Sequence, residues 1–254
     1  MTATFYPVEH VLAINLEKDA ARMERVQRQA AEFGIPISRV PAIYGKELDV
    51  EYVQSFLGSL TAFFQNRPNV VGCALSHMRA WRRIVEEGWE CALIVEDDFT
   101  FTDGIRKFKK GVTLPKDWSV LYLGHSRGKW PRNPCSRVPT PDYGVGKPGG
   151  PVVVEGTYAG GQPVEVIQFV SERDAPMGCW GYVMRRSACE WCLARYRINE
   201  PVDVFLSSDS TLSTLQVLGV LPIVITHCYE FGSSTSFFRQ NTAIKDGEIG
   251  RAHV

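Results

Sequence analysis

The feature that most constrains the fold is an alternation of short apolar runs with segments of helical periodicity. The first apolar run, residues 10–16, has the length and composition of a buried strand. Apolar side chains then recur at helical spacing over residues 20–33, and Gly34-Ile35-Pro36 ends that segment. A second strand is expected at residues 39–42. This order of strand, helix and strand predicts an α/β sheet that binds a nucleotide at the carboxyl ends of its strands.

The same alternation continues toward the middle of the chain. Residues 70–87 carry apolar side chains at steps of three and four, which predicts a second helix. Residues 91–95 form an apolar strand that runs directly into Glu96-Asp97-Asp98, and residues 119–123 form a further apolar run. We therefore expect a mostly parallel central sheet with three carboxylates at the carboxyl end of one strand.

Residues 126–176 differ in character, because eight of the fifteen prolines fall there. Residues 152–157 and 164–170 flank Gly160-Gly161 and predict a β-hairpin within this long insertion, which we interpret as a substrate lid. Beyond it we expect order at residues 179–184, a helix at 186–195, a segment at 201–206, a helix-like segment at 208–218 and a last strand at 220–225. The prediction is one α/β domain over residues 1–254, with a loose tail over 244–254.

Charge and hydropathy exclude some classes of function. Lysine plus arginine and aspartate plus glutamate each number 28, and the basic residues form no stripe, so we do not expect a nucleic-acid partner. No apolar run approaches the roughly 18 residues that span a membrane, and residues 1–7 lack the features of a secretory signal. Seven cysteines in no regular framework fit a reducing compartment. We expect a cytoplasmic protein, either in solution or associated peripherally with the inner face of the membrane.

The carboxylate triplet is the strongest candidate for chemistry. Like charges a few ångströms apart raise one another's pKa unless a cation neutralises them. Mg²⁺ and Mn²⁺ take carboxylate oxygens and bridge to nucleotide phosphates. In an extended strand end, Glu96 and Asp98 would point one way and Asp97 the other. The alternative to a metal site is a solvated acidic turn.

Three further residues have positions that suggest a role. His227 lies just past the last apolar strand, and imidazole joins carboxylate in many Mn²⁺ sites, although a structural histidine is the alternative. Asp203 is an acid among apolar neighbours at the start of an element, as expected of a helix cap or a catalytic base. His77, on the helix before the triplet, fits an interior hydrogen bond and a site role equally well.

Together these motifs resemble glycosyltransferase family 25, which includes bacterial lipopolysaccharide sugar transferases and procollagen galactosyltransferases. The family's ordered motifs are similar to Ile14-Asn15-Leu16 with Arg22, Gly72-Cys73-Ala74-Leu75-Ser76-His77 with Trp81, Glu96-Asp97-Asp98, Leu121-Tyr122-Leu123-Gly124, Gly181-Tyr182, the segment from Pro201 to Leu206, and Thr226-His227-Cys228. Any one of these motifs would be a weak signal, but seven in order over some two hundred residues are specific.

The resemblance implies a GT-A fold, a UDP-galactose or UDP-glucose donor, a divalent metal and transfer with inversion at the anomeric carbon. Carried over by position, the triplet would hold metal and donor. Asp98 would be the foremost metal ligand, Glu96 would face ribose or metal, and His227 would complete the metal shell. Asn15 and Arg22 would lie near the nucleotide. By analogy with short members of the family, the acceptor would be a lipopolysaccharide-type glycan, with other hydroxyl acceptors open.

The chemistry also needs a group that removes a proton from the acceptor hydroxyl. Asp203 is our candidate for this base, because an inverting displacement needs one carboxylate beyond the metal ligands. Asp209 is the second choice. Both could instead cap a helix that starts near Ser208.

The sequence departs from the family pattern at three places. The family often carries acids at the positions of Ala21 and Tyr44, and a glutamate where this chain has Val70-Val71. These changes fit either an altered donor or a glycosyltransferase-like binding protein without turnover. A metal-dependent nucleotidyltransferase is the other alternative, and it would release pyrophosphate where a transferase releases a nucleoside diphosphate.

Overall fold

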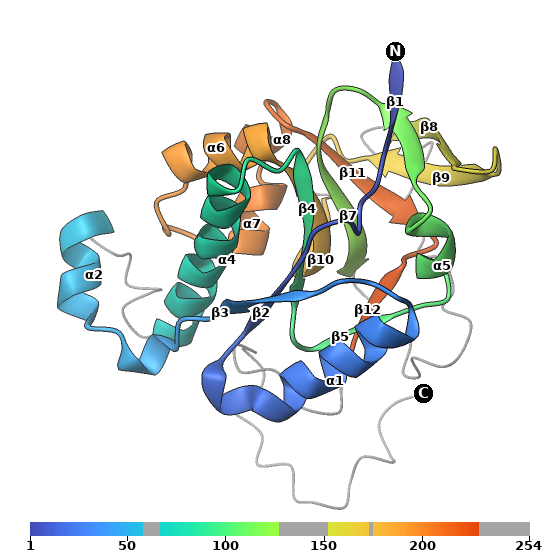
Figure 1. Cartoon of the computed structure of the whole chain (residues 1–254). Coiled ribbons are helices and arrows are strands. Elements are labelled where there is room, and N and C mark those ends of the chain that lie inside the picture. Colours follow the sequence, from blue (N-terminus) through green and yellow to red (C-terminus); the bar gives the residue numbers. More distant parts are fainter. Residues whose placement is uncertain (58–66, 127–151, 173–174, 229–254) are drawn as a thin grey trace, which may run out of the picture.

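The computed structural model describes residues 1–57, 67–126, 152–172 and 175–228, and shows helices packed on both faces of a large curled sheet (Figure 1). The strands are β1 Thr2–Phe5, β2 Val11–Asn15, β3 Ser38–Pro41, β4 Cys91–Glu96, β5 Phe99–Phe101, β6 Val112–Pro115, β7 Trp118–Ser126, β8 Val152–Tyr158, β9 Pro163–Gln168, β10 Met177–Arg185, β11 Gln216–Leu221 and β12 Ile225–His227. The helices are η1 Glu17–Asp19, α1 Ala20–Glu32, η2 Gly45–Glu47, α2 Val50–Leu57, α4 Pro68–Glu86, α5 Ile105–Phe108, α6 Arg186–Arg195, α7 Val202–Ser207 and α8 Asp209–Leu212. Within these ranges no helix combines the length and hydropathy needed to span a membrane.

The main sheet is mixed, with the strand order β1-β6-β8-β9-β11-β7-β10-β4-β2-β3. Only the pairs β2/β3, β2/β4 and β7/β11 are parallel, and the other six neighbouring pairs are antiparallel. The α/β class is confirmed, but the expected mostly parallel sheet is wrong. A central strand covered on both faces is apolar throughout, so its sequence indicates burial and carries no information on direction. β10, for example, runs antiparallel between β4 and β7.

The two faces of the sheet are covered by different helices. On β4, Ala92 and Ile94 join a core with Trp81 of α4, while Leu93 and Val95 join a second core with Met23 of α1. This is the alternation expected of a strand buried on both faces. The helices predicted at residues 20–33 and 70–87 are confirmed as α1 and α4. The carboxyl end of β4 therefore lies between these two helices.

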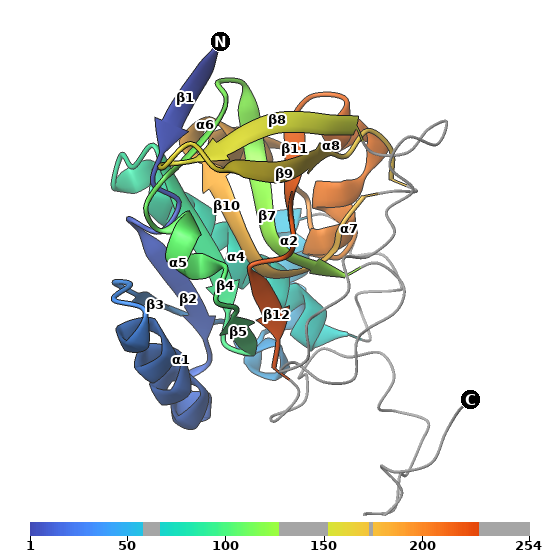
Figure 2. The same cartoon turned by 90° about the vertical axis from the view of Figure 1, so that its right-hand side faces the viewer.

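The predicted hairpin is confirmed as β8 and β9, which pair antiparallel from Val152–Gln168 to Thr157–Pro163. It belongs to the main sheet, because β9 pairs with β11 and β8 pairs with β6. Figure 2 shows the hairpin at one end of the molecule and β5 with β12 toward the other. Residues 127–151 of the predicted insertion and the tail at 244–254 lie outside the described residues, and the lid role stays a prediction.

The predicted helix-like segment at 208–218 is wrong over its second half. Helix α8 ends at Leu212, and β11 begins at Gln216 and pairs with β7 and β9. Short apolar runs fit helix and strand equally well, and here residues 216–221 form a strand between β7 and β9. The strand expected at 220–225 is divided between the end of β11 and the start of β12.

Strand β12 crosses the main sheet at two glycines. A Cβ atom on Gly124 of β7 would lie 2.5 Å from the carbonyl oxygen of Ile225 in β12. A Cβ atom on Gly181 of β10 would lie 2.4 Å from Cδ1 of the same Ile225. Only glycine permits so close an approach of another backbone. β12 then pairs with β5, with His227 opposite Phe99. The close crossing brings His227 to the turn that follows β4.

Candidate active site

A cavity of about 600 Å³, its open mouth included, lies at the carboxyl ends of β2 and β4. It is lined by Ile14, Leu16, Asp19, Arg22, Ala42, Ile43, Tyr44, Gly45, Asn69, Cys73, Ser76, His77, Glu96, Asp97 and Asp98. Five predicted site residues thus share one cavity, namely Arg22, His77 and the carboxylate triplet. Its size suits a small-molecule ligand.

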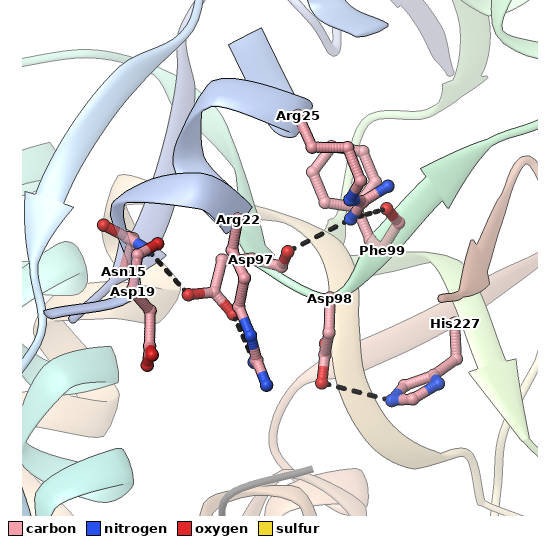
Figure 3. Close-up of polar contacts among 8 residues, drawn as sticks. All are labelled: Asn15, Asp19, Arg22, Arg25, Asp97, Asp98, Phe99 and His227. Carbon is pink, nitrogen blue, oxygen red and sulfur yellow. Dashed lines mark hydrogen bonds and ion pairs between the residues drawn. The ribbon is translucent and has the colours of Figure 1, made fainter. Parts of the chain in front are cut away.

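Asp97 is held by side chains from β2 and α1 (Figure 3). Asn15 Nδ2 donates to Asp97 Oδ2 at 2.7 Å and to the carbonyl oxygen of Asp19 at 3.0 Å, while Arg22 donates to Asp97 Oδ1 at 3.0 Å. Arg39 Nε donates to Asn15 Oδ1 at 3.0 Å. Burial raises the pKa of Asp97, and the bonds from Asn15 and Arg22 oppose that shift. The Asn15 amide is therefore engaged in holding Asp97.

Arg25 is a positioning residue that the sequence analysis missed. Its guanidinium donates to the backbone carbonyls of Asp97 at 3.1 Å and Phe99 at 2.6 Å (Figure 3). These bonds fix the turn that carries Asp98. The available signal was the spacing of Arg22 and Arg25, which lie three residues apart and so share a face of α1.

Asp98 and His227 meet at the edge of the cavity. Asp98 Oδ2 lies 3.1 Å from His227 Nε2, and the two side chains are 7% and 11% exposed (Figure 3). The amide of Cys228 donates to the backbone carbonyl of Asp98 at 2.5 Å. Asp98 Oδ1 is buried and has no hydrogen-bond partner among the described residues. A buried carboxylate oxygen in this state is stabilised by a cation.

Glu96, unlike Asp98, is in contact with His77. Its Oε1 lies 3.4 Å from Nε2 of the fully buried His77, whose Nδ1 lies 2.8 Å from the hydroxyl of Tyr182. Trp81 Nε1 donates to the same hydroxyl at 2.9 Å. Burial raises the pKa of Glu96, and the contact with His77 opposes that shift. The predicted ligand set is thus divided, with Asp98 beside His227 and Glu96 beside His77.

The two candidate bases lie outside the cavity lining. Asp203, in the first turn of α7, accepts from the amides of Gly178 at 3.2 Å and Val204 at 3.0 Å. Burial is the main cause that raises the pKa of the cavity residue Cys73, and the charges of Glu96 and then Asp203 add to it, so Asp203 lies within electrostatic reach of the site. Asp209 accepts from the amide of Glu172 at 2.8 Å.

The predicted helix start near Ser208 is confirmed, and its cap is Ser208 itself. The side chain of Ser208 accepts from the amide of Thr211 in α8. Asp209 is the first residue of α8, and its carboxylate accepts a hydrogen bond from the backbone amide of Glu172 and does not cap the helix.

Comparison with known proteins bears on the cavity residues. A sequence model of glycosyltransferase family 25, described as LPS biosynthesis protein, matches residues 8–136. A glycosyltransferase 25 family member of Drosophila pseudoobscura pseudoobscura is 29% identical over 134 residues, which are 48% of this chain and 21% of that protein. Procollagen galactosyltransferase 1 of Danio rerio is 28% identical over 131 residues, 47% of this chain and 22% of that protein. Procollagen galactosyltransferase 1-B of Xenopus laevis is 30% identical over 131 residues, which are 47% of this chain and 21% of that protein.

These matches cover about a fifth of the length of the relatives. The family match includes the carboxylate triplet, His77, Arg22 and Asn15. Asp203, Asp209 and His227 lie beyond it, so the family match does not bear on their roles.

Proposed function

The chain belongs to glycosyltransferase family 25, and on that premise we propose that it transfers a hexose from a UDP-sugar to a hydroxyl group, with inversion and with a divalent cation. The observation that carries the proposal is the pairing of Asp98 with His227 at the edge of a cavity at strand ends. Two of the relatives are named procollagen galactosyltransferase, which favours galactose over glucose. The fold proposed is of the GT-A type, with the parallel strands β3, β2 and β4 beside the donor site.

The donor atoms of the Asp98 and His227 pair fit Mn²⁺ or Mg²⁺. A carboxylate oxygen and an imidazole nitrogen are common Mn²⁺ ligands. Asp98 Oδ1, buried without a hydrogen-bond partner within the ranges described, has its lone pairs available for a cation. Such a cation, when bound, supplies the positive charge that neutralises the departing diphosphate. Asp98 and His227 are the residues that would hold it.

The protein's own residues would position the donor and the acceptor. Arg22, fixed beside Asp97, places a guanidinium in the cavity wall where the nucleotide would bind. Asp203 is the proposed base for the acceptor hydroxyl, with Asp209 as second choice. Two backbone amides fix the Asp203 carboxylate, which would limit its motion as it accepts a proton. The acceptor proposed is a lipopolysaccharide-type glycan.

Nucleoside diphosphate release tests the proposal without the acceptor, because slow hydrolysis of the donor is sufficient. Wild-type protein and Asp98→Asn would be compared on a panel of nucleotide sugars, with and without Mn²⁺. We expect release from one UDP-sugar that needs both Mn²⁺ and Asp98. Asp103→Asn is the matched control, because the side chain of Asp103 is 93% exposed and lies outside the cavity lining.

The same assay separates the alternatives. Pyrophosphate release from a nucleoside triphosphate would indicate a nucleotidyltransferase. Binding of a UDP-sugar by calorimetry, without release in the presence of Mn²⁺ and acceptor glycans, would indicate a binding protein without turnover. Absence of both binding and release would contradict the proposal.

A further inference from the structure

A second group of potential metal ligands lies in the cavity wall. Cys73 and His77 are four residues apart on α4, so their side chains share one face of the helix. Each offers one ligand atom, as does Glu96 at the end of β4, and these three atoms all lie within 4.8 Å of one another. All three residues line the cavity.

The chain fixes this group from two sides. Helix α4 is pressed against the segment before η2, because a Cβ atom on Gly72 would lie 2.5 Å from the carbonyl oxygen of Ile43. Tyr182 of β10 holds the His77 ring through Nδ1 at 2.8 Å. A metal-bound histidine usually engages its second ring nitrogen in this way, which sets the orientation of the ring. The fixed ring directs Nε2 of His77 toward Glu96.

A second observation, separate from the clustering of the three ligand atoms, concerns the ring nitrogen Nε2 of His77. The His77 side chain is fully buried, and in the parts of the chain described here Nε2 makes no hydrogen bond. Glu96 Oε1 lies 3.4 Å away, within ion-pair distance but without the geometry of a hydrogen bond. A buried nitrogen without a hydrogen bond is costly, whereas a metal ion between the nitrogen and the carboxylate would satisfy both.

The chemistry of the three donors selects the type of metal. A thiolate, an imidazole and a carboxylate form a ligand set that Zn²⁺ accepts, whereas Mn²⁺ and Mg²⁺ prefer oxygen. Three protein ligands leave a fourth position open, as in zinc sites that bind a water or a ligand.

We propose that Cys73, His77 and Glu96 form a second metal site, specific for Zn²⁺ or a similar cation, in the wall of the cavity. It is separate from the cation that we propose at Asp98 and His227. The inference does not depend on transferase activity, since it rests on the donor set and its geometry. A metal ion at this site would fix Glu96 on the α4 side of the triplet.

Cobalt(II) binding provides a direct test, because a thiolate ligand gives Co²⁺ a charge-transfer band in the near ultraviolet. Metal-free protein would be titrated with Co²⁺ alone. We expect one equivalent to produce the band in the wild type, and Cys73→Ser and His77→Gln to abolish or strongly weaken it. Tyr182→Phe should weaken Co²⁺ binding by about 10-fold to 100-fold, the usual effect of removing the partner of a histidine ligand.

Two control variants separate this site from the neighbouring one. Cys228 follows His227, so a thiolate band could in principle arise there. Cys228→Ser and Asp98→Asn should both retain the full band. A band that persists in Cys73→Ser, or that disappears in Cys228→Ser, would overturn the proposal. Because the readout is metal binding, it stays valid whether or not any UDP-sugar is cleaved.

A measurement on the wild type removes the risk that a variant fails to fold. Cys73 lines the cavity and should react with a small alkylating reagent, and peptide mass spectrometry can follow that single thiol. One equivalent of Zn²⁺ should slow the alkylation of Cys73 at least about 10-fold, while Mn²⁺ should leave it unchanged. Equal alkylation rates with and without Zn²⁺, together with the absence of a cobalt band, would overturn the proposal.

Discussion

Asp97 and Asp98 are neighbours in the sequence, yet their carboxylates have opposite surroundings. Both oxygens of Asp97 accept hydrogen bonds from side chains, at 2.7 Å from Asn15 and 3.0 Å from Arg22. Asp98 has one oxygen 3.1 Å from His227, and its other oxygen is buried without a hydrogen-bond partner in the described part of the chain.

The contrast indicates that adjacent acidic residues can have different roles, one structural and one in binding a cation. A carboxylate with both oxygens engaged stabilises the local structure, here the junction of β2, α1 and the turn after β4. A carboxylate with a buried open oxygen is destabilising by itself and is suited to a cation. On this basis Asp97 is a positioning residue and Asp98 a candidate ligand, although the two are adjacent and both line the cavity.

The largest expected effect is a difference between Asp98 and Asp97 variants in the rate of donor cleavage. Asp98→Asn should lower the rate of donor cleavage by about 1,000-fold, equivalent to about 4 kcal/mol, because the variant cannot hold the proposed cation. Asp97→Asn, assayed in parallel at a temperature where it is folded, should lose much less. Initial rates of UDP release provide the comparison. Equal losses in the two variants would remove the distinction between them.

The next effect concerns stability. Asp97→Ala should lower the free energy of unfolding by about 3 to 5 kcal/mol, because it breaks the largely buried ion pair between Arg22 and Asp97 and removes the acceptor of the hydrogen bond from Asn15. Urea denaturation followed by tryptophan fluorescence measures this loss. Adding Arg22→Met to Asp97→Ala should recover part of the stability. If the double variant loses the sum of the two single effects, Arg22 and Asp97 are not coupled.

The third prediction concerns the pH dependence of the free energy of unfolding, which arises from a histidine outside the cavity lining. Burial lowers the pKa of His125 in β7 from 6.5 to about 4, so the folded protein disfavours the protonated imidazole. The unfolded chain then binds more protons between these pH values, and stability should fall as pH drops from about 6.5 to about 4. The expected loss is about 3 kcal/mol, at about 1.4 kcal/mol for each pH unit.

Urea denaturation at several pH values would measure that slope. His125→Gln should have a lower stability at neutral pH but a flatter pH dependence than the wild type. A variant with the same slope as the wild type would show that another group is responsible.

The smallest expected effect tests how His227 is brought to Asp98. Gly124→Ala should cost about 1 to 2 kcal/mol, because its Cβ would collide with the backbone of Ile225 and displace β12. Activity should fall although no ligand is changed, and a higher Mn²⁺ concentration should restore part of it. Gly160→Ala is the matched control, because no atom lies within 4 Å of its built Cβ. Unchanged Mn²⁺ dependence in Gly124→Ala would argue against this role of β12.

Local sequence patterns predict the elements that carry the site. The triplet after β4, the helices α1 and α4 and the β8–β9 hairpin all follow from hydrophobic spacing and turn residues. The direction of β10 and the start of β11 do not, because a continuously apolar segment indicates burial alone. Within the site, the pairing of Asp98 with His227 was expected, and the structure brings the two together.

The contacts that divide the triplet could not be predicted from the sequence. The bond between His77 and Tyr182, and the approach of His77 to Glu96, join α4, β10 and β4, and their geometry depends on how a helix packs on the sheet. Arg25 was missed because its targets are backbone carbonyls, so its spacing from Arg22 places it on the same face of α1 but does not identify what it binds. Side-chain identity thus indicates which groups are available, and tertiary packing decides which of them meet.

The most direct test of the central claim is Mn²⁺ binding, measured by the electron paramagnetic resonance signal of free Mn²⁺ in the presence of UDP. The wild type should bind Mn²⁺ at one site, and Asp97→Asn should bind it with similar affinity. Asp98→Asn and His227→Gln should each bind at least about 10-fold more weakly. Mn²⁺ binding by Asp98→Asn with wild-type affinity would contradict the assignment of Asp98 and His227 as the cation site.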